Sequence, residues 1–201
     1  MTLQPEHQRH IRTIASAKLL GVRERQMLLR QHYNNVPDAA WVQDHARTVD
    51  AQVPASHPIH GHVICGEGIP VDVPVSVHRA VGGESDFPCP GEILAAALAS
   101  CLDTAIRMIA NLKGIELAHL EVQVSLGADV RRTLMTGEKV PVGFQTASLK
   151  VDLKAKGELQ EAQLHALLDA AENSCVILQT LQAPPPVQIE RCFGAAARIS
   201  S

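Results

Sequence analysis

The stretch most informative about the fold is residues 90–101, which read Pro90-Gly91-Glu92-Ile93-Leu94-Ala95-Ala96-Ala97-Leu98-Ala99-Ser100-Cys101. It opens the most apolar segment of the chain and follows a loop rich in turn residues. Proline is favoured just inside a helix start and glycine just past a helix end. The sequence therefore predicts a helix from Pro90 to about Lys113, ended by Gly114. A cysteine in the middle of such an Ala-rich helix, here Cys101, is by itself more typical of a core than of a site.

Alternating apolar residues on both sides of this helix predict strands. The valines from Val71 to Val77 alternate with other residue types, and Pro74 inside this run favours an edge strand. Further strands are expected at 120–126 and 147–153 and from Val187 onward. A second helix is expected from Glu158 to about Leu181, where a proline run follows. This order predicts an α+β fold in which an antiparallel sheet packs on two helices.

The N-terminal residues follow another pattern. Apolar residues recur at helical spacings among Arg, Gln and His as far as Asn34, and a second short helix is expected from Pro37 to about Val49. The stretch from Val53 to Pro58 is typical of a linker. We therefore expect a helical N-terminal extension over residues 1–55 and a main domain over residues 56–201.

Composition excludes several classes of protein. The chain has 201 residues, 46% of them hydrophobic, with a formal charge of −3, as in soluble globular proteins. Only 2% of residues are aromatic and no dense Lys/Arg cluster occurs, so no nucleic-acid partner is expected. The N-terminus shows no secretory signal, and the uncharged stretch from Ile93 to Leu102 is shorter than the roughly 20 residues of a membrane helix. We expect a cytoplasmic protein without a membrane partner, whose five cysteines are free thiols.

Two cysteines besides Cys101 are candidates for chemistry. Cys175 lies at the end of an apolar stripe on the second expected helix. Two thiols on helices that share one core could face each other, as a peroxidatic and a resolving thiol must. Cys89 lies just before the helix that begins at Pro90, where peptide dipoles favour a reactive thiolate, although a plain loop cysteine is the simpler interpretation.

Several motifs together resemble those of the OsmC/Ohr family, the osmotically inducible and organic-hydroperoxide-resistance proteins. Residues 90–101 are similar to the family's P-x-E-L-L-x-A-A-L-x-x-C helix, and residues 171–181 to its second-cysteine helix. The double glycine Gly82-Gly83 resembles its pre-helix loop, so the resemblance covers roughly residues 60 to 193. It implies antiparallel sheets wrapped around two central helices in an intertwined homodimer, with each active site at the subunit interface.

The resemblance also implies a reaction. The Cys101 thiolate attacks an organic hydroperoxide and becomes a sulfenic acid, Cys175 condenses with it to a disulfide, and an external dithiol restores both thiols. We therefore expect a thiol-dependent peroxidase of oxidative stress defence that needs no cofactor and no metal ion. Its expected partners are a second copy of the chain, an organic hydroperoxide and a dithiol reductant.

The chain departs from the family at the charged positions of this site. In the family's peroxidases a Glu ten residues before the reactive Cys orients an Arg from the first strands, and here that position is Gly91, with Glu92 beside it. Glu92 and Arg79 are the expected acidic and basic groups. Arg107 is an alternative, although it pairs more naturally with Asp103 at i, i+4 spacing.

Two other functions stay open. A protein with this fold but no peroxidase activity would bind a small apolar ligand in a pocket at the dimer interface. A metal site is the other alternative, because His57, His60, His62 and Cys65 form a run of metal-ligand residue types. Their spacing matches no established structural zinc pattern.

Overall fold

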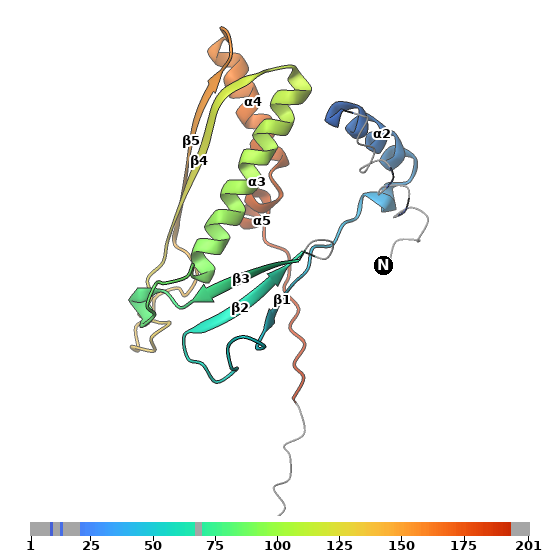
Figure 1. Ribbon diagram of the computed structural model, residues 1–201. Coiled ribbons are helices and arrows are strands. Elements are labelled where there is room, and N and C mark those ends of the chain that lie inside the picture. Colours follow the sequence, from blue (N-terminus) through green and yellow to red (C-terminus); the bar gives the residue numbers. More distant parts are fainter. Residues whose placement is uncertain (1–8, 10–12, 14–20, 67–69, 194–201) are drawn as a thin grey trace, which may run out of the picture.

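One long helix, α3 (Pro90–Lys113), forms the axis of the molecule in the computed structural model, which describes residues 9, 13, 21–66 and 70–193. The strands β4 (Leu117–Gly127) and β5 (Thr146–Ala155) cover one side of α3, as Figure 1 shows. The helices α4 (Glu161–Ser174) and α5 (Val176–Gln182) pack against α3 on another side. The expected α+β class is confirmed.

The predicted helix at 90–113 is confirmed at both ends. Pro90 occupies its first turn, and the Glu92 carboxylate accepts a hydrogen bond from the Cys89 backbone N–H at 2.8 Å. Gly114 ends the helix in the left-handed conformation, with φ 71°, which glycine adopts without steric cost. By length and composition α3 could cross a membrane, and no other helix of the described chain could. In this fold it is the core helix.

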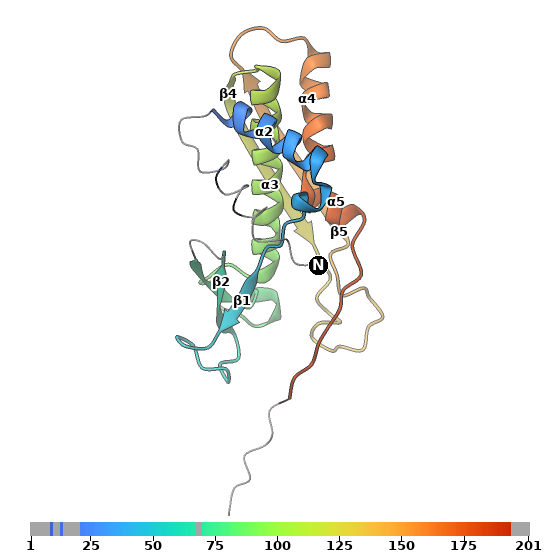
Figure 2. The ribbon, with the colours of Figure 1, turned by 90° about the vertical axis from the view of Figure 1, so that its right-hand side faces the viewer.

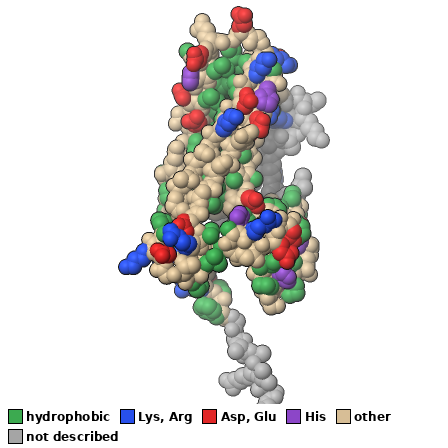
Figure 3. Space-filling view, turned by 90° about the vertical axis from the view of Figure 1, so that its left-hand side faces the viewer, with side chains coloured by type: hydrophobic (Ala, Val, Ile, Leu, Met, Phe, Trp, Pro, Cys, Tyr) green, Lys and Arg blue, Asp and Glu red, His purple; other side chains and the backbone are tan. Residues whose placement is uncertain are grey.

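The core lies between α3, the β4–β5 sheet and the C-terminal helices. Its buried cluster contains Leu98, Leu102, Ala105, Ile106, Ala171 and Cys175. The inward residues of β4 and β5, among them Val122 and its cross-strand partner Val151, pack against this cluster. The outward residues, such as Glu121 and Lys150, are exposed. Figure 3 views the molecule from the side on which this sheet lies. The predicted alternation of both strands is therefore confirmed.

A second, smaller sheet has the order β1 (Ala46–Val49), β2 (His60–Cys65) and β3 (Val71–Ser76). The predicted edge position of Pro74 is confirmed, because within residues 21–66 and 70–193 β3 pairs only with β2. The predicted helix over 37–49 is wrong: only Pro37–Ala40 forms a short 3₁₀ helix, η1. The residues from Ala46 onward gain backbone hydrogen bonds by pairing with β2, a long-range interaction that local propensity does not reveal. The domain boundary expected near residue 55 thus falls between β1 and β2, two strands that pair with each other.

Two expectations for the C-terminal part are also wrong. The helix expected over 158–181 is interrupted at Cys175, whose backbone is extended (φ −78°, ψ 100°) between α4 and α5. The strand expected from Val187 is not formed within residues 183–193, where Val187 and Ile189 are 82% and 74% exposed. The preceding prolines lack N–H donors, and none of the described strands pairs with this segment.

The helix α2 (Val22–Asn35) confirms part of the expected N-terminal helical segment; residues 1–20, apart from 9 and 13, lie outside the described chain. It lies on the far side of α3 from the β4–β5 sheet, as Figures 1 and 2 show. The Arg23 guanidinium donates a hydrogen bond to the Leu112 carbonyl at 2.7 Å. This bond joins α2 to the C-terminal end of α3.

Candidate functional site

Two of the predicted site residues, Cys101 and Cys175, come together in the core. Cys101 lies at the middle of α3, half-buried, and packs against the buried cluster to which Cys175 belongs. Cys175 lies at the break between α4 and α5 and has no exposed surface. The two thiols are free, and Cys101 lies close enough to Cys175 to contribute to the raised pKa of its thiol. Residues 74 positions apart in sequence thus meet as a thiol pair.

The surroundings of Cys175 favour its protonated form. Burial raises the pKa of the Cys175 thiol, and the neighbouring Cys101 side chain raises it further. The backbone N–H groups of Leu178 and Ile177 act in the opposite direction but do not outweigh burial. Cys175 is fully buried whereas Cys101 is half-buried, so the two thiols are not equivalent.

Glu92 lies apart from this thiol pair. Hydrogen bonds from the backbone N–H and then the thiol of Cys89, together with the charge of nearby His78, lower the pKa of the Glu92 carboxyl despite some desolvation. Nine residues separate Glu92 from Cys101, which is roughly 13 Å along the helix axis at 1.5 Å per residue. In this chain Glu92 therefore caps the helix and does not contact the thiol at its middle.

The two candidate arginines do not bind Cys101 either. Arg79 lies in the 3₁₀ helix η2 (Arg79–Val81), and its exposed guanidinium makes no hydrogen bond or ion pair with any described residue. Arg107 donates two hydrogen bonds to the Asp103 carboxylate, at 2.7 and 3.1 Å. The predicted Arg107–Asp103 pair is confirmed. Within the described part of one chain, no hydrogen bond or ion pair joins either arginine to Cys101.

A cavity of about 670 Å³ lies at the N-terminal end of α3. Its lining is mainly apolar, with side chains such as Val81, Leu126 and Phe144, and this volume is typical of small-molecule sites. The polar groups on its wall are few and include His78, Cys89, Glu92 and Thr133. Cys89, only 8% exposed, thus lines a pocket, whereas Cys101 is not among the lining residues.

Phe144 fills the space beside Gly91, the position at which the family's peroxidases carry a Glu. A Cβ atom added to Gly91 would lie 3.0 Å from Phe144 Cζ and 3.6 Å from Cys89 Sγ. The aromatic ring occupies the space into which an acidic side chain at position 91 would extend. Phe144 and His78 were missed in the sequence because the two segments that carry them lie far apart and share no motif.

The run from His57 to Cys65 does not converge on a common point. His62 Nδ1 lies 2.9 Å from Asp72 Oδ1 on the neighbouring strand, whereas His60 Nε2 lies 2.9 Å from Asp86 Oδ2 in the loop before α3. Among the described residues these four do not form a metal-binding cluster. The carboxylates that pair with the two histidines were also missed, because no regular spacing relates them.

The comparisons with known proteins agree with this architecture. The family model for OsmC-like proteins matches residues 82–190. An organic hydroperoxide resistance protein OsmC from Legionella pneumophila is 21% identical, with a TM-score of 0.51 over 72% of this chain and 92% of that one. An OsmC-like protein from Mycoplasma pneumoniae is 14% identical, with a TM-score of 0.54 over 71% and 89%.

An OsmC-like protein from Vibrio cholerae is 16% identical, with a TM-score of 0.54 over 70% of this chain and 94% of that one. A search of curated protein sequences found no match. Because the sequence identities are low, the solved structures show the fold alone. They share the antiparallel sheets and helices of this chain. The family model covers more than half of the sequence. The resemblance at residues 90–101 and 171–181 is thereby confirmed, and the chain belongs to the OsmC-like protein family.

Proposed function

We propose that this protein is a thiol-dependent peroxidase that reduces organic hydroperoxides, with Cys101 as the attacking thiol and Cys175 as the resolving thiol. The meeting of two free thiols in one core cluster carries this proposal. An aliphatic core needs no second cysteine beside the first, whereas a sulfenic acid needs a nearby thiol to escape further oxidation. A protein named for organic hydroperoxide resistance, from L. pneumophila, has the same fold.

The reaction divides into three balanced steps. The Cys101 thiolate attacks the terminal oxygen of the hydroperoxide, the O–O bond breaks, and the leaving alkoxide takes up a proton to become an alcohol. Cys101 is now a sulfenic acid. The Cys175 thiol attacks its sulfur, a disulfide forms and water leaves. A dithiol of the cytoplasm then reduces the disulfide by two exchange steps and is itself oxidised to a disulfide.

A second copy of the chain is part of this proposal. The uncovered stripe of α3 carries Ala96, Ser100, Thr104 and Met108, which are exposed and small or apolar, and it lies beside Cys101. A helix this apolar is normally covered on most of its surface. We therefore propose a homodimer that covers this stripe and supplies the basic group that no described residue of the same chain provides to Cys101.

Thiol counting tests the proposed reaction directly. The reduced protein is mixed with one equivalent of cumene hydroperoxide, with hydrogen peroxide in parallel, and free thiols and mass are measured. The wild-type protein, with five free cysteines, should fall to three and carry a Cys101–Cys175 disulfide. Cys175→Ala should lose only one thiol and gain one oxygen atom, and Cys101→Ser should lose none.

Cys192→Ser is the matched control, because Cys192 is exposed and lies outside both cysteine motifs. This variant should still lose two thiols. Hydroperoxide consumption by Cys101→Ser at the wild-type rate would contradict the proposal, as would a disulfide mapped to another pair.

A second candidate function is the binding of a small apolar ligand, which the 670 Å³ pocket at Gly91 and Phe144 favours. It predicts that a fluorescent apolar probe binds saturably. The Val81→Asp variant, which places a charge in the pocket wall, should bind this probe more weakly. The same candidate function also predicts that thiols stay unchanged when hydroperoxide is added. Loss of two thiols in the experiment above would instead support the peroxidase.

A further inference from the structure

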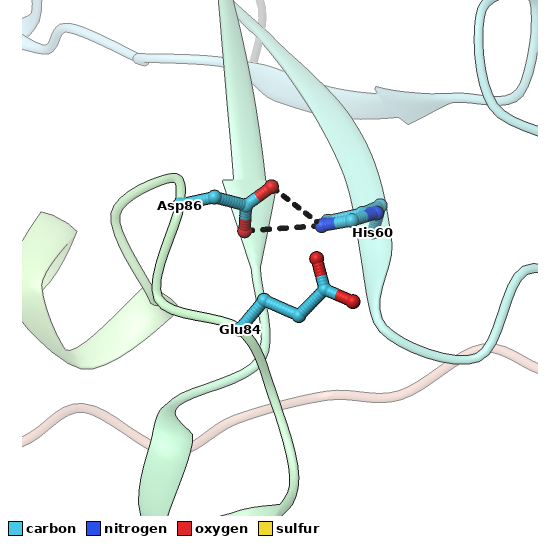
Figure 4. Close-up of side chains that lie close together, drawn as sticks. All are labelled: His60, Glu84 and Asp86. Atoms are coloured by element: carbon cyan, nitrogen blue, oxygen red, sulfur yellow. Dashed lines mark hydrogen bonds and ion pairs between the residues drawn. The ribbon is translucent and has the colours of Figure 1, made fainter.

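We infer that His60, Glu84 and Asp86 form a binding site for a divalent metal ion of the zinc class, separate from the thiol pair. His60 belongs to β2, and the two carboxylates belong to the loop that leads into α3, as Figure 4 shows. One ligand atom from each residue lies within 4.8 Å of the other two. Among the described residues no other group of three His, Cys, Asp or Glu side chains has this spacing.

The distances fit a shared ion. His60 Nε2 lies 2.9 Å from Asp86 Oδ2 and 3.1 Å from Asp86 Oδ1. Zinc lies about 2.0–2.2 Å from nitrogen and oxygen ligands, so two ligands of one ion are at most about 4.4 Å apart. The His60–Asp86 pair already satisfies this limit. Glu84 is exposed, and rotation of its long side chain closes any remaining distance.

The His60 ring is held in position on two sides. It stacks on the His57 ring with centroids 4.8 Å apart, and it meets Phe87 edge-on at 5.8 Å. The His60 backbone N–H also donates a hydrogen bond to His57 Nδ1 at 3.1 Å. His60 is partly buried, with 19% of its side chain exposed. A ligand fixed in this way loses little side-chain entropy when an ion binds.

The charges around the site favour a cation. Two carboxylates converge on one imidazole, and no lysine or arginine of the described chain pairs with either of them. The Glu84 carboxylate makes no hydrogen bond or ion pair with any described residue. A divalent ion would offset the repulsion between the two carboxylates. Imidazole nitrogen with carboxylate oxygen is a ligand set that suits zinc, with water completing a four-coordinate site.

Binding would link two parts of the fold. The ion replaces the proton on His60 Nε2, and it joins β2 to the loop that ends at Cys89. Because Cys89 lines the apolar pocket, the ion would brace one wall of that pocket without touching a ligand in it. This site uses none of the residues of the proposed peroxidase reaction, so the two proposals stand or fall separately.

Cobalt titration of the reduced, full-length protein tests the site, because Co²⁺ reports its ligands by absorption. Nitrogen and oxygen ligands give weak visible bands, whereas thiolate ligands add an intense charge-transfer band in the near ultraviolet. The wild-type protein should bind one Co²⁺ per chain without that band, and Zn²⁺ should displace it. Removal of Glu84 or His60 as a ligand should weaken binding by at least about tenfold.

Glu84→Gln is the main variant, since an exposed side chain can change without loss of folding, which far-UV circular dichroism verifies. His62→Gln is the matched control: His62 lies on the same strand and pairs with Asp72 at the same distance, but no third ligand joins it. It should bind Co²⁺ like the wild type. The proposal is overturned if no Co²⁺ binds at millimolar concentration, if Glu84→Gln binds as tightly as wild type, or if the charge-transfer band accompanies binding.

Discussion

The close approach of Phe144 to Gly91 gives a quantitative test of whether the aromatic ring fills the space beside position 91. Gly91→Ala places a methyl group in the first turn of α3, and alanine is favoured over glycine in a helix by about 1 kcal/mol. The new Cβ would lie 3.0 Å from Phe144 Cζ, whereas carbon atoms in contact are usually about 3.5–4.0 Å apart. The ring must therefore move by roughly half an ångström.

The size of the effect follows from the surroundings of Phe144. Overpacking a core costs about 1–3 kcal/mol, and this ring belongs at the low end because it is 45% exposed and lies outside the strands. The gain and the cost then nearly cancel, so Gly91→Ala alone should change the free energy of unfolding by less than about 0.5 kcal/mol. In a Phe144→Ala background the same change should stabilise the protein by about 1 kcal/mol.

Urea unfolding of the four proteins, followed by far-UV circular dichroism, measures this difference. All samples need the same protein concentration, because dimerisation would make stability depend on it. With m-values of about 1–3 kcal/mol/M, the gain of about 1 kcal/mol raises the unfolding midpoint by roughly 0.3–1 M. Equal stabilisation by Gly91→Ala in both backgrounds would contradict this prediction, because Phe144 would then not occupy the space beside position 91.

Two further predictions concern titrating groups. The pKa of Glu92 is lowered in the folded state, so its ionised form stabilises the fold above its ordinary pKa, and this contribution is lost as pH falls through the folded value. Glu92→Gln should therefore destabilise at pH 7 more than at pH 3, measured by urea unfolding at each pH. The pKa of Cys175 is raised, so the unfolded chain ionises first above pH 9 and alkaline pH should destabilise the wild type more than Cys175→Ala. Iodoacetamide should label Cys192 and spare Cys175 in the native protein, as peptide mass mapping would show; equal labelling would contradict the burial of Cys175.

The parts of the fold that could be predicted are those that local chemistry determines. Pro90 and Gly114 mark the ends of α3, and the alternation along β3, β4 and β5 reflects one buried face. The parts that could not be predicted depend on distant partners. β1 has four residues and forms because β2 pairs with it, and the break at Cys175 contains neither glycine nor proline.

The residues of the candidate site also fall into two groups, those that a local motif identifies and those that depend on distant parts of the chain. Cys101 and Cys175 could be singled out because each lies in a stretch predicted to be helical, and the two helices were expected to share one core. The ring of Phe144 beside Gly91, and the carboxylates beside His60, come from loops whose positions depend on the whole fold. No periodicity in the sequence relates a loop residue to its neighbour across a pocket. Such groups become visible only when the chain is folded.

The separation of the two core cysteines along the chain has a consequence for stability. A bond between Cys101 and Cys175 would close a loop of about 75 residues, which restricts the unfolded chain. The loop-entropy relation assigns such a crosslink about 4 kcal/mol at 25 °C. An oxidised chain should thus resist unfolding more strongly than a reduced one, and the relative sizes of the two melting transitions would report how much of the protein in a sample has turned over and awaits reduction.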